Sequence, residues 1–285
     1  MGLCYSIDIS SKENYSVILK LPHNENCYEI NQNSNSWNFN QNVNNVLKKL
    51  YNDKLNNWIV YNDENPNDDN AGSTFAHAKG ILAWNNNIIT WLIHSVPKFP
   101  ESFDGTNKFP DINHSELEYG QSFIFIKLDI KNLENILTQL FIMKPNIYIS
   151  NFNYDNFKKL HKKNEYKILK INEKIYHVTK SHIYNKDLYE DILIPNFGGP
   201  CYTETWVRGH HCTENEQCKM INKISWNNGI EYIHTQDHSK YCYSDKNWVM
   251  VGDLNRMTSQ FKRGGGGIII KDNNITKLFK EIMKN

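Results

Sequence analysis

Apolar residues recur along the first half of the chain in short blocks separated by polar loops. Strand-like blocks occupy residues 17–22, 58–61, 75–84, 88–95 and 123–130. The third and fourth blocks are separated by Asn85-Asn86-Asn87, which predicts a hairpin. Apolar residues at helical spacing predict helices over 42–51 and 133–141.

The same kind of pattern starts again after Lys144-Pro145. Strands are predicted at 146–150, 202–207, 230–235, 248–251 and 267–271, with a hairpin over 166–183. A helix is predicted over 154–162, a Gly/Pro turn over 195–200 and a closing helix around 278–283. Two comparable stretches of mixed strands and helices predict an α/β protein with two related halves, residues 1–144 and 145–285.

The charge balance is close to neutral, which excludes a strongly basic or acidic protein. Lys and Arg number 32 against 31 Asp and Glu, so the net charge of the 285 residues is +1. Any binding of nucleic acid must therefore depend on a local basic groove. No stretch approaches the roughly 18–20 apolar residues of a membrane span, so we expect no membrane partner.

The six cysteines leave two interpretations open. Cys4, Cys27, Cys201, Cys212, Cys218 and Cys242 could form up to three disulfides in an oxidising compartment, or stay thiols in a reducing one. His210-His211-Cys212 with Cys218 is a candidate zinc site, but its spacing is not that of standard zinc knuckles. A Cys212–Cys218 bridge or free thiols are favoured over zinc. The N-terminus lacks a basic region followed by an apolar one, which predicts a cytoplasmic protein.

The candidate chemistry lies in two copies of the motif H-x-K, one in each half. The first is His77-Ala78-Lys79 and the second is His238-Ser239-Lys240. Because residues i and i+2 of a strand point to the same face, each motif directs an imidazole and an ammonium to one place. A single H-x-K has little value as a signal, whereas two copies in corresponding positions are more informative.

The residues after each motif sharpen this interpretation. Asp245 and then Gly252-Asp253-Leu254-Asn255 come close to the H-x-K, D, G-S, N pattern of the phospholipase D superfamily. Asp253 replaces the serine of that pattern, and one residue fewer precedes Asn255. In the first half, His94-Ser95 takes the place of the G-S segment and Lys98 stands where an asparagine is expected.

A wider set of segments resembles landmarks of the deoxyribonuclease II family, in the family's order. They are Leu19-Lys20-Leu21-Pro22, Val60-Tyr61-Asn62-Asp63, His77-Ala78-Lys79-Gly80, residues 91–100, Tyr119-Gly120-Gln121-Ser122, Asp237-His238-Ser239-Lys240, residues 252–256 and Arg263-Gly264-Gly265-Gly266. The resemblance implies a phospholipase D-like sandwich of two pseudo-symmetric halves, with mixed sheets flanked by helices. It further implies that each half brings one H-x-K to a shared cleft.

The resemblance also implies an activity and a location. The activity is endonucleolytic hydrolysis of DNA without a metal or cofactor, favoured at acidic pH, leaving 3′-phosphate and 5′-hydroxyl ends. The location is lysosomal or secreted. Three departures affect these implications: the segment between Pro145 and Cys201 is short, the family's secretion signal is missing, and Ile268-Ile269-Ile270 replaces the usual partner of Cys242.

Hydrolysis of a phosphodiester calls for these residue types. Lys79 and Lys240 are suited to neutralise the anionic phosphate. By resemblance to two-half relatives, His77 is the nucleophile that forms a phosphohistidine and His238 is the acid/base, with the reverse order as the alternative. Neutral and protonated imidazoles coexist near a pKa of ~6.5, in mildly acidic solution. Asn255 completes the predicted catalytic set.

A second set of residues is predicted to bind the substrate. It consists of Ser95, Asp253, Arg256, Tyr119 and Gln121. Asp253, or else Asp245, is a candidate to orient an imidazole, and His94 is expected to be structural. The run that starts at Arg263-Gly264 is interpreted as a flexible turn, with a phosphate cradle as the less favoured alternative.

Other functions stay open beside cleavage of DNA. The same fold could act on another phosphodiester such as RNA or a cyclic dinucleotide, or bind DNA without cutting it. A zinc protein built around His210 and Cys218 is a third alternative. A monomer and a homodimer are both compatible with the sequence.

Overall fold

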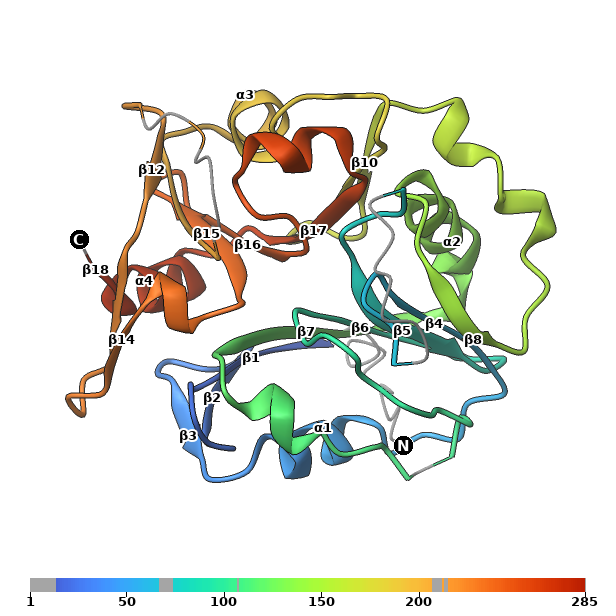
Figure 1. Cartoon of the computed structure of the whole chain (residues 1–285), viewed down its shortest axis with the longest axis horizontal. Coiled ribbons are helices and arrows are strands. Elements are labelled where there is room, and N and C mark those ends of the chain that lie inside the picture. The colour runs from blue at the N-terminus through green and yellow to red at the C-terminus, as the bar shows by residue number, and fades with distance from the viewer. Residues whose placement is uncertain (1–13, 67–73, 107, 207–211, 213–214, 285) are drawn as a thin grey trace, which may run out of the picture.

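Two large β-sheets face each other across the middle of the protein, and helices lie between them at the sides and on their outer faces (Figure 1). The computed structural model describes residues 14–66, 74–106, 108–206, 212 and 215–284.

The first sheet has eight strands in the order β3-β2-β1-β7-β6-β5-β4-β8. Their bounds are β1 (Asn14–Lys20), β2 (Cys27–Asn31), β3 (Asn38–Asn40), β4 (Asn57–Asn62), β5 (Lys79–Trp84), β6 (Ile88–His94), β7 (Gln121–Asp129) and β8 (Ile147–Ser150). All of these pairings are antiparallel. The outer face packs against α1 (Val43–Leu50), which Asn42 caps by accepting the N–H of Asn45.

The second sheet has seven strands in the order β12-β11-β15-β16-β17-β10-β9. Their bounds are β9 (Tyr166–Lys170), β10 (Ile175–Lys180), β11 (Cys201–Thr205), β12 (Cys218–Met220), β15 (Lys240–Ser244), β16 (Trp248–Gly252) and β17 (Gly265–Ile270). Its outer face packs against the π-helical turn η6 (Tyr189–Leu193), which continues into α3 (Ile194–Phe197). A three-stranded sheet, in the order β14-β13-β18, consists of β13 (Lys223–Ser225), β14 (Glu231–Ile233) and β18 (Met283–Lys284).

The two large sheets contain the same four-strand arrangement. The order β1-β7-β6-β5 in the first sheet corresponds to β10-β17-β16-β15 in the second, with antiparallel pairing throughout. The helix α2 (Leu133–Ile142) follows β7, and α4 (Asn273–Ile282) follows β17. The predicted fold class, mixed sheets flanked by helices, is therefore confirmed.

The main hydrophobic core lies between the sheets. Alternate residues of each central strand point inward, so Trp91 of β6 and Ile268 of β17 are fully buried in one apolar cluster. The apolar faces of α2 and α4 close this cluster at its sides. α2 and α4 have ten residues each, and within the described ranges no helix has the length and apolar character needed to cross a bilayer.

Several predicted elements differ from the observed ones for identifiable reasons. The helix predicted over 154–162 is instead two 3-10 turns, η4 (Asp155–Phe157) and η5 (Leu160–Lys162), whose apolar residues pack against α2. The strand predicted from residue 75 begins only at Lys79, because Ala76 and His77 donate their backbone N–H groups to Lys144 and Gly264 outside the sheet. β8 follows Lys144 and pairs with β4, so the first sheet extends past that residue.

Truncation of an inner side chain should destabilise both sheets together. We expect Ile268→Ala to lower the free energy of unfolding by about 2–5 kcal/mol, because a large apolar group is lost from a closed core. The 42% exposed Ile183 provides the matched control. Ile183→Ala should change stability by no more than about 0.5 kcal/mol. Urea denaturation measures the free energy of unfolding of both variants. Equal losses of stability would place Ile268 outside a shared core.

Candidate functional site

The two H-x-K motifs occupy corresponding places at the ends of two strands. Lys79 is the first residue of β5 and Lys240 is the first residue of β15, so each histidine lies two residues ahead of its strand. A small hollow between the sheets is lined by residues of both halves: His77, Lys79, His94, Ser95, Lys240 and Asp253. His94, expected to be structural, is thus part of its wall.

The His77 ring has a defined hydrogen-bonded orientation. Its Nδ1 lies 2.7 Å from the backbone oxygen of Asp253. A carbonyl can only accept a hydrogen bond, so Nδ1 carries the proton and Nε2 carries the lone pair. Burial lowers the pKa of His77 to about 3, and Lys79, Lys240 and Arg263 lower it as well, against the opposing effect of Asp63. The ring is therefore a neutral imidazole in mild acid.

Lys79 is held in a buried cluster of alternating charges at the end of β4. Its Nζ lies 2.5 Å from Oδ1 of Asp63 and 3.1 Å from Oε1 of Glu64. Arg263, from the other half, places Nη2 2.9 Å from Oδ2 of Asp63. Burial by itself would raise the pKa of Asp63, but Lys79, His77 and Arg263 together hold it well below its usual range. Asp63 therefore stays ionised and ties the two halves together.

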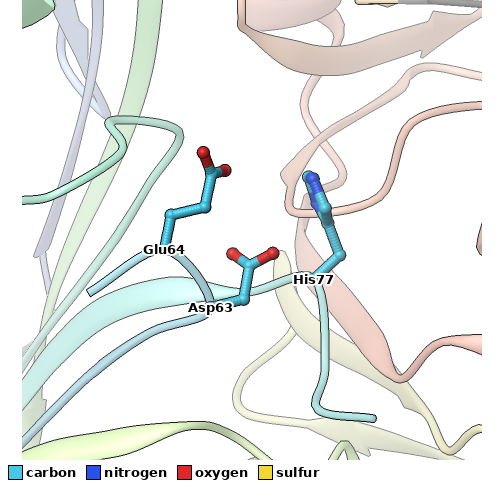
Figure 2. Close-up of side chains that lie close together, drawn as sticks. All are labelled: Asp63, Glu64 and His77. Carbon is cyan, nitrogen blue, oxygen red and sulfur yellow. The ribbon is translucent and has the colours of Figure 1, made fainter. Parts of the chain in front are cut away.

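Asp63, Glu64 and His77 also have the donor types of a cation site, and Figure 2 shows the three side chains converging. Their ligand atoms all lie within 4.8 Å of one another. The carboxylates are already neutralised, however, because Lys79 and Arg263 contact the same oxygens. A divalent cation here would have to displace one ammonium group and bear the repulsion of the guanidinium. The cluster fits a lysine-positioning role better than a metal.

His238 is enclosed by aromatic rings. Its ring lies parallel to Tyr119, with centroids 4.2 Å apart and planes inclined by 8°, and the Trp206 ring centroid lies 3.6 Å away. Its backbone N–H donates to the oxygen of Gly120 at 2.8 Å. These contacts fix the plane of the imidazole. Tyr119 thus stacks on a catalytic candidate, but neither Tyr119 nor His238 is among the residues that line the hollow.

Lys240 differs from Lys79 in its electrostatic surroundings. Its Nζ donates to the backbone oxygen of His238 at 2.5 Å. Burial lowers the pKa of Lys240 to about 8, and the nearby Lys79 contributes in the same direction. By contrast, the paired carboxylates of Asp63 and Glu64 outweigh burial and raise the pKa of Lys79. Lys240 therefore brings a less compensated positive charge to the hollow.

Polar side chains of the predicted set adjoin Ser95 and Asp253, two of the residues that line the hollow. Ser95 donates its hydroxyl to Oε1 of Gln121 at 2.5 Å and accepts the N–H of Ser122 at 2.9 Å. Asn255 is buried just after Asp253. Burial raises the pKa of Asp253 well above its usual value, against the opposing effects of Lys79, Lys240 and the backbone N–H of Gly266. Asp253 thus orients His77 through its backbone oxygen.

Three sequence candidates lie elsewhere. Arg256 is fully buried, with Nε 3.2 Å from Asp187 and Nη2 3.2 Å from Glu190, so its charge is engaged away from the hollow. Asp245 pairs with Lys280 at 2.8 Å near the surface. The glycines from Gly265 onward lie in β17 rather than in a flexible turn or a cradle.

The zinc interpretation can be examined only in part, since His210 and His211 lie outside the described residues. Cys218 lies on β12 beside Cys201 of β11, and their Sγ atoms are 3.3 Å apart as free thiols. Cys212 and Cys242 are also buried thiols. Cys4 lies outside the described residues.

Sequence reasoning missed Asp63, Glu64 and Trp206 as site residues. The β4–β5 pairing places Asn62 opposite Lys79, so the two acidic residues that follow Asn62 meet the lysine. That signal exists only once the register of the strands is known. Trp206 directly follows β11, the neighbour of β15, and carries no chemical signature of its own.

The fold and the site define a class of protein with two related sheets, in which Lys79 and Lys240 of the two H-x-K motifs line one hollow. The family model described as "Deoxyribonuclease II" matches residues 15–285. The chain belongs to the deoxyribonuclease II family.

Individual relatives agree with this assignment. A Caenorhabditis elegans protein named "Deoxyribonuclease-2" is 30% identical over 246 residues, which are 78% of this chain and 64% of the relative. The match thus spans slightly less than two thirds of that protein's length. "Plancitoxin-1" of Acanthaster planci is 29% identical over 78% of this chain and 68% of its own. "Deoxyribonuclease-2-beta" of Mus musculus is 30% identical over 79% and 69%.

Removal of the Asp63 charge should be costly and dependent on pH. We expect Asp63→Asn to lower the free energy of unfolding at pH 6 by about 3–5 kcal/mol, because two buried cations lose their partner. The folded-state pKa of Asp63 is lowered, so its contribution is present above the unfolded pKa of ~3.9 and is lost as the pH falls. The difference in unfolding free energy between Asp63→Asn and wild type should therefore be smaller at pH 3 than at pH 6.

Asp53→Asn is the control for this measurement. Asp53 pairs with the partly exposed Lys127 at 2.6 Å. Its loss should lower stability by about 1 kcal/mol or less. Chemical denaturation at pH 6 and pH 3 measures the free energy of unfolding of each variant. A difference between Asp63→Asn and wild type that is the same at both pH values would contradict a charge-based role.

Proposed function

We propose that the protein is an endonuclease that hydrolyses DNA phosphodiester bonds through a phosphohistidine on His77. The orientation of the His77 ring is the observation that carries this proposal. Because Nδ1 donates to the backbone oxygen of Asp253, Nε2 carries the lone pair and is the reactive atom. The low pKa of His77 keeps Nε2 unprotonated in acid. The deoxyribonuclease names of the relatives support DNA as the substrate.

The first step exchanges one bond to phosphorus for another. The Nε2 lone pair of His77 attacks phosphorus, and the bond from phosphorus to the 5′-oxygen breaks. Protonated His238 gives its proton to the departing 5′-oxygen, so the leaving strand ends in a 5′-hydroxyl. The Lys240 ammonium stabilises the additional negative charge on the phosphoryl oxygens, with Lys79 on the other side of the hollow.

The second step regenerates the enzyme. Neutral His238 takes a proton from water, whose oxygen attacks phosphorus while the phosphorus–nitrogen bond breaks. The product is a 3′-phosphate, and His77 returns as a neutral imidazole whose Nδ1–H still donates to the backbone oxygen of Asp253. Asn255 and Asp253 are the proposed hydrogen-bond donors to the phosphate, because the single hydroxyl proton of Ser95 is donated to Gln121. A protonated Asp253 can donate, whereas an ionised one would repel the substrate.

Cleavage of plasmid DNA in excess EDTA tests the proposal. Wild type should nick and linearise the plasmid, whereas His77→Ala and His238→Ala should each lose at least about 100-fold in rate, because nucleophile and acid/base are both required. His182→Ala, on the exposed turn after β10, is the control and should retain wild-type activity. An inert wild type, or cutting abolished by EDTA, would refute the mechanism.

The pH dependence follows from the two opposite protonation states. Activity needs His77 neutral, which its pKa of about 3 ensures above that pH. It also needs His238 protonated, so the rate should fall once the pH is high enough to deprotonate that imidazole. Initial rates from pH 3 to 8 should thus be highest in mild acid, and a rate that rises continuously to pH 8 would contradict these assignments.

The end groups provide an independent check on the direction of attack. Products should accept label from polynucleotide kinase without prior phosphatase treatment, because a 5′-hydroxyl is already present. Products that need the phosphatase first would show that the 3′-oxygen leaves instead.

A further inference from the structure

Lys20 is a buried lysine that the proposed chemistry does not use. It is the last residue of β1 and is 1% exposed. Its Nζ donates to the backbone oxygens of Leu21 at 2.7 Å, Asn24 at 3.0 Å and Leu117 at 2.7 Å. All three ammonium protons therefore have acceptors, which offsets the cost of burying the charge.

Lys180 repeats this arrangement in the second half. It is the last residue of β10 and is 1% exposed. Its Nζ donates to the backbone oxygens of Gln260 at 3.3 Å, Phe261 at 2.8 Å and Arg263 at 2.7 Å. Burial lowers the pKa of both lysines to about 8, so both remain charged in acid.

The two lysines hold equivalent turns. Lys20 pairs across the sheet with Gln121, the first residue of β7, and Lys180 pairs with Gly265, the first residue of β17. Each ammonium therefore binds the segment that leads into the corresponding inner strand. We call residues 117–120 and 260–264 the bracing turns.

Each bracing turn contacts the histidine of the opposite half. The carbonyl of Gly120, in the first half, accepts the N–H of His238 at 2.8 Å. The carbonyl of Gly264, in the second half, accepts the N–H of His77 at 2.9 Å. The residue before each glycine also reaches across, since Tyr119 stacks on His238 and Arg263 binds Asp63 beside Lys79.

The fit at these crossing points leaves little room for adjustment. A Cβ atom on Gly120 would lie 2.6 Å from Oδ1 of Asp237, the residue before His238. A Cβ atom on Gly264 would lie 1.9 Å from the backbone oxygen of Met143. A shift of either turn would therefore disturb close-packed neighbours and also move the carbonyl that the opposite histidine binds.

We propose that Lys20 and Lys180 are crossed positioning residues, in which Lys20 sets the place of His238 and Lys180 sets the place of His77. Neither lysine touches substrate. The inference rests on the proposed function, because it assigns each lysine to one of two chemically different histidines. Misplacement by about 1 Å can cost on the order of 100-fold in rate, which makes the effect measurable.

A substrate whose leaving group needs no proton distinguishes the role of Lys20 from the role of Lys180. In thymidine 3′-(4-nitrophenyl phosphate), nitrophenolate replaces the 5′-oxygen and departs unaided, so the first step needs the nucleophile but not the acid. Lys20→Met should slow DNA cleavage by about 10- to 100-fold yet release the first equivalent of nitrophenol at close to the wild-type rate. Lys180→Met should slow both reactions by about 100-fold.

Two reference variants distinguish an error in the positioning role from an error in the proposed function. His238→Ala should show the Lys20→Met pattern and His77→Ala the Lys180→Met pattern. If these reference variants do not differ from wild type, the proposed function is wrong. If they do differ but Lys20→Met slows both substrates equally, or slows neither, the positioning role is overturned.

Two further variants control for folding. Lys127→Met removes a lysine from β7 outside the bracing turn and should behave as wild type on both substrates. If Lys20→Met does not fold, Gly120→Ala takes its place, because the added methyl group displaces the same turn against Asp237 without touching the lysine. The selective loss on DNA is expected for it as well, and equal loss on both substrates would count against the inference.

Discussion

The site depends on a reciprocal pair of backbone hydrogen bonds across the two halves. His77 donates its N–H to Gly264, and His238 donates its N–H to Gly120. Both histidines lie just outside their strands, where the sheet no longer provides a backbone partner. The opposite half provides it instead, so that docking of the halves and assembly of the site are one event. The core between the sheets supplies the apolar burial that drives this docking.

The two H-x-K motifs have corresponding backbone positions but different electrostatic surroundings. The first motif lies beside Asp63, Glu64 and Arg263, which fix Lys79 as a paired cation. The second motif lies among aromatic rings, and its lysine has a pKa lowered to about 8. A two-step transfer needs two imidazoles in opposite protonation states, and identical surroundings could not provide them. In the proposed mechanism, this difference in charge is what would let two similar motifs act as nucleophile and acid.

Much of this arrangement could be predicted from the sequence because it resides in local pattern. Short apolar runs located β5, β6, β7 and β16, and the repeated H-x-K located Lys79 and Lys240, which line the hollow from the two halves. Contacts that depend on register could not be predicted in this way. Asp63 meets Lys79 only through the β4–β5 pairing, and Asp253 binds His77 through a main-chain oxygen that any residue would offer. Arg256 looked like a phosphate ligand because sequence does not reveal that Asp187 and Glu190 enclose it.

The use of main-chain oxygens at the crossing points has a consequence for how the two halves can change over generations. A carbonyl is present whatever the side chain, so substitutions elsewhere in a turn need not disturb the alignment of the histidines. The corresponding positions have in fact diverged: Tyr119 stands where the other half has Arg263, and Ser95 where it has Asp253. Two similar halves that are joined through their backbones can differ side chain by side chain without losing the geometry on which the partner half relies.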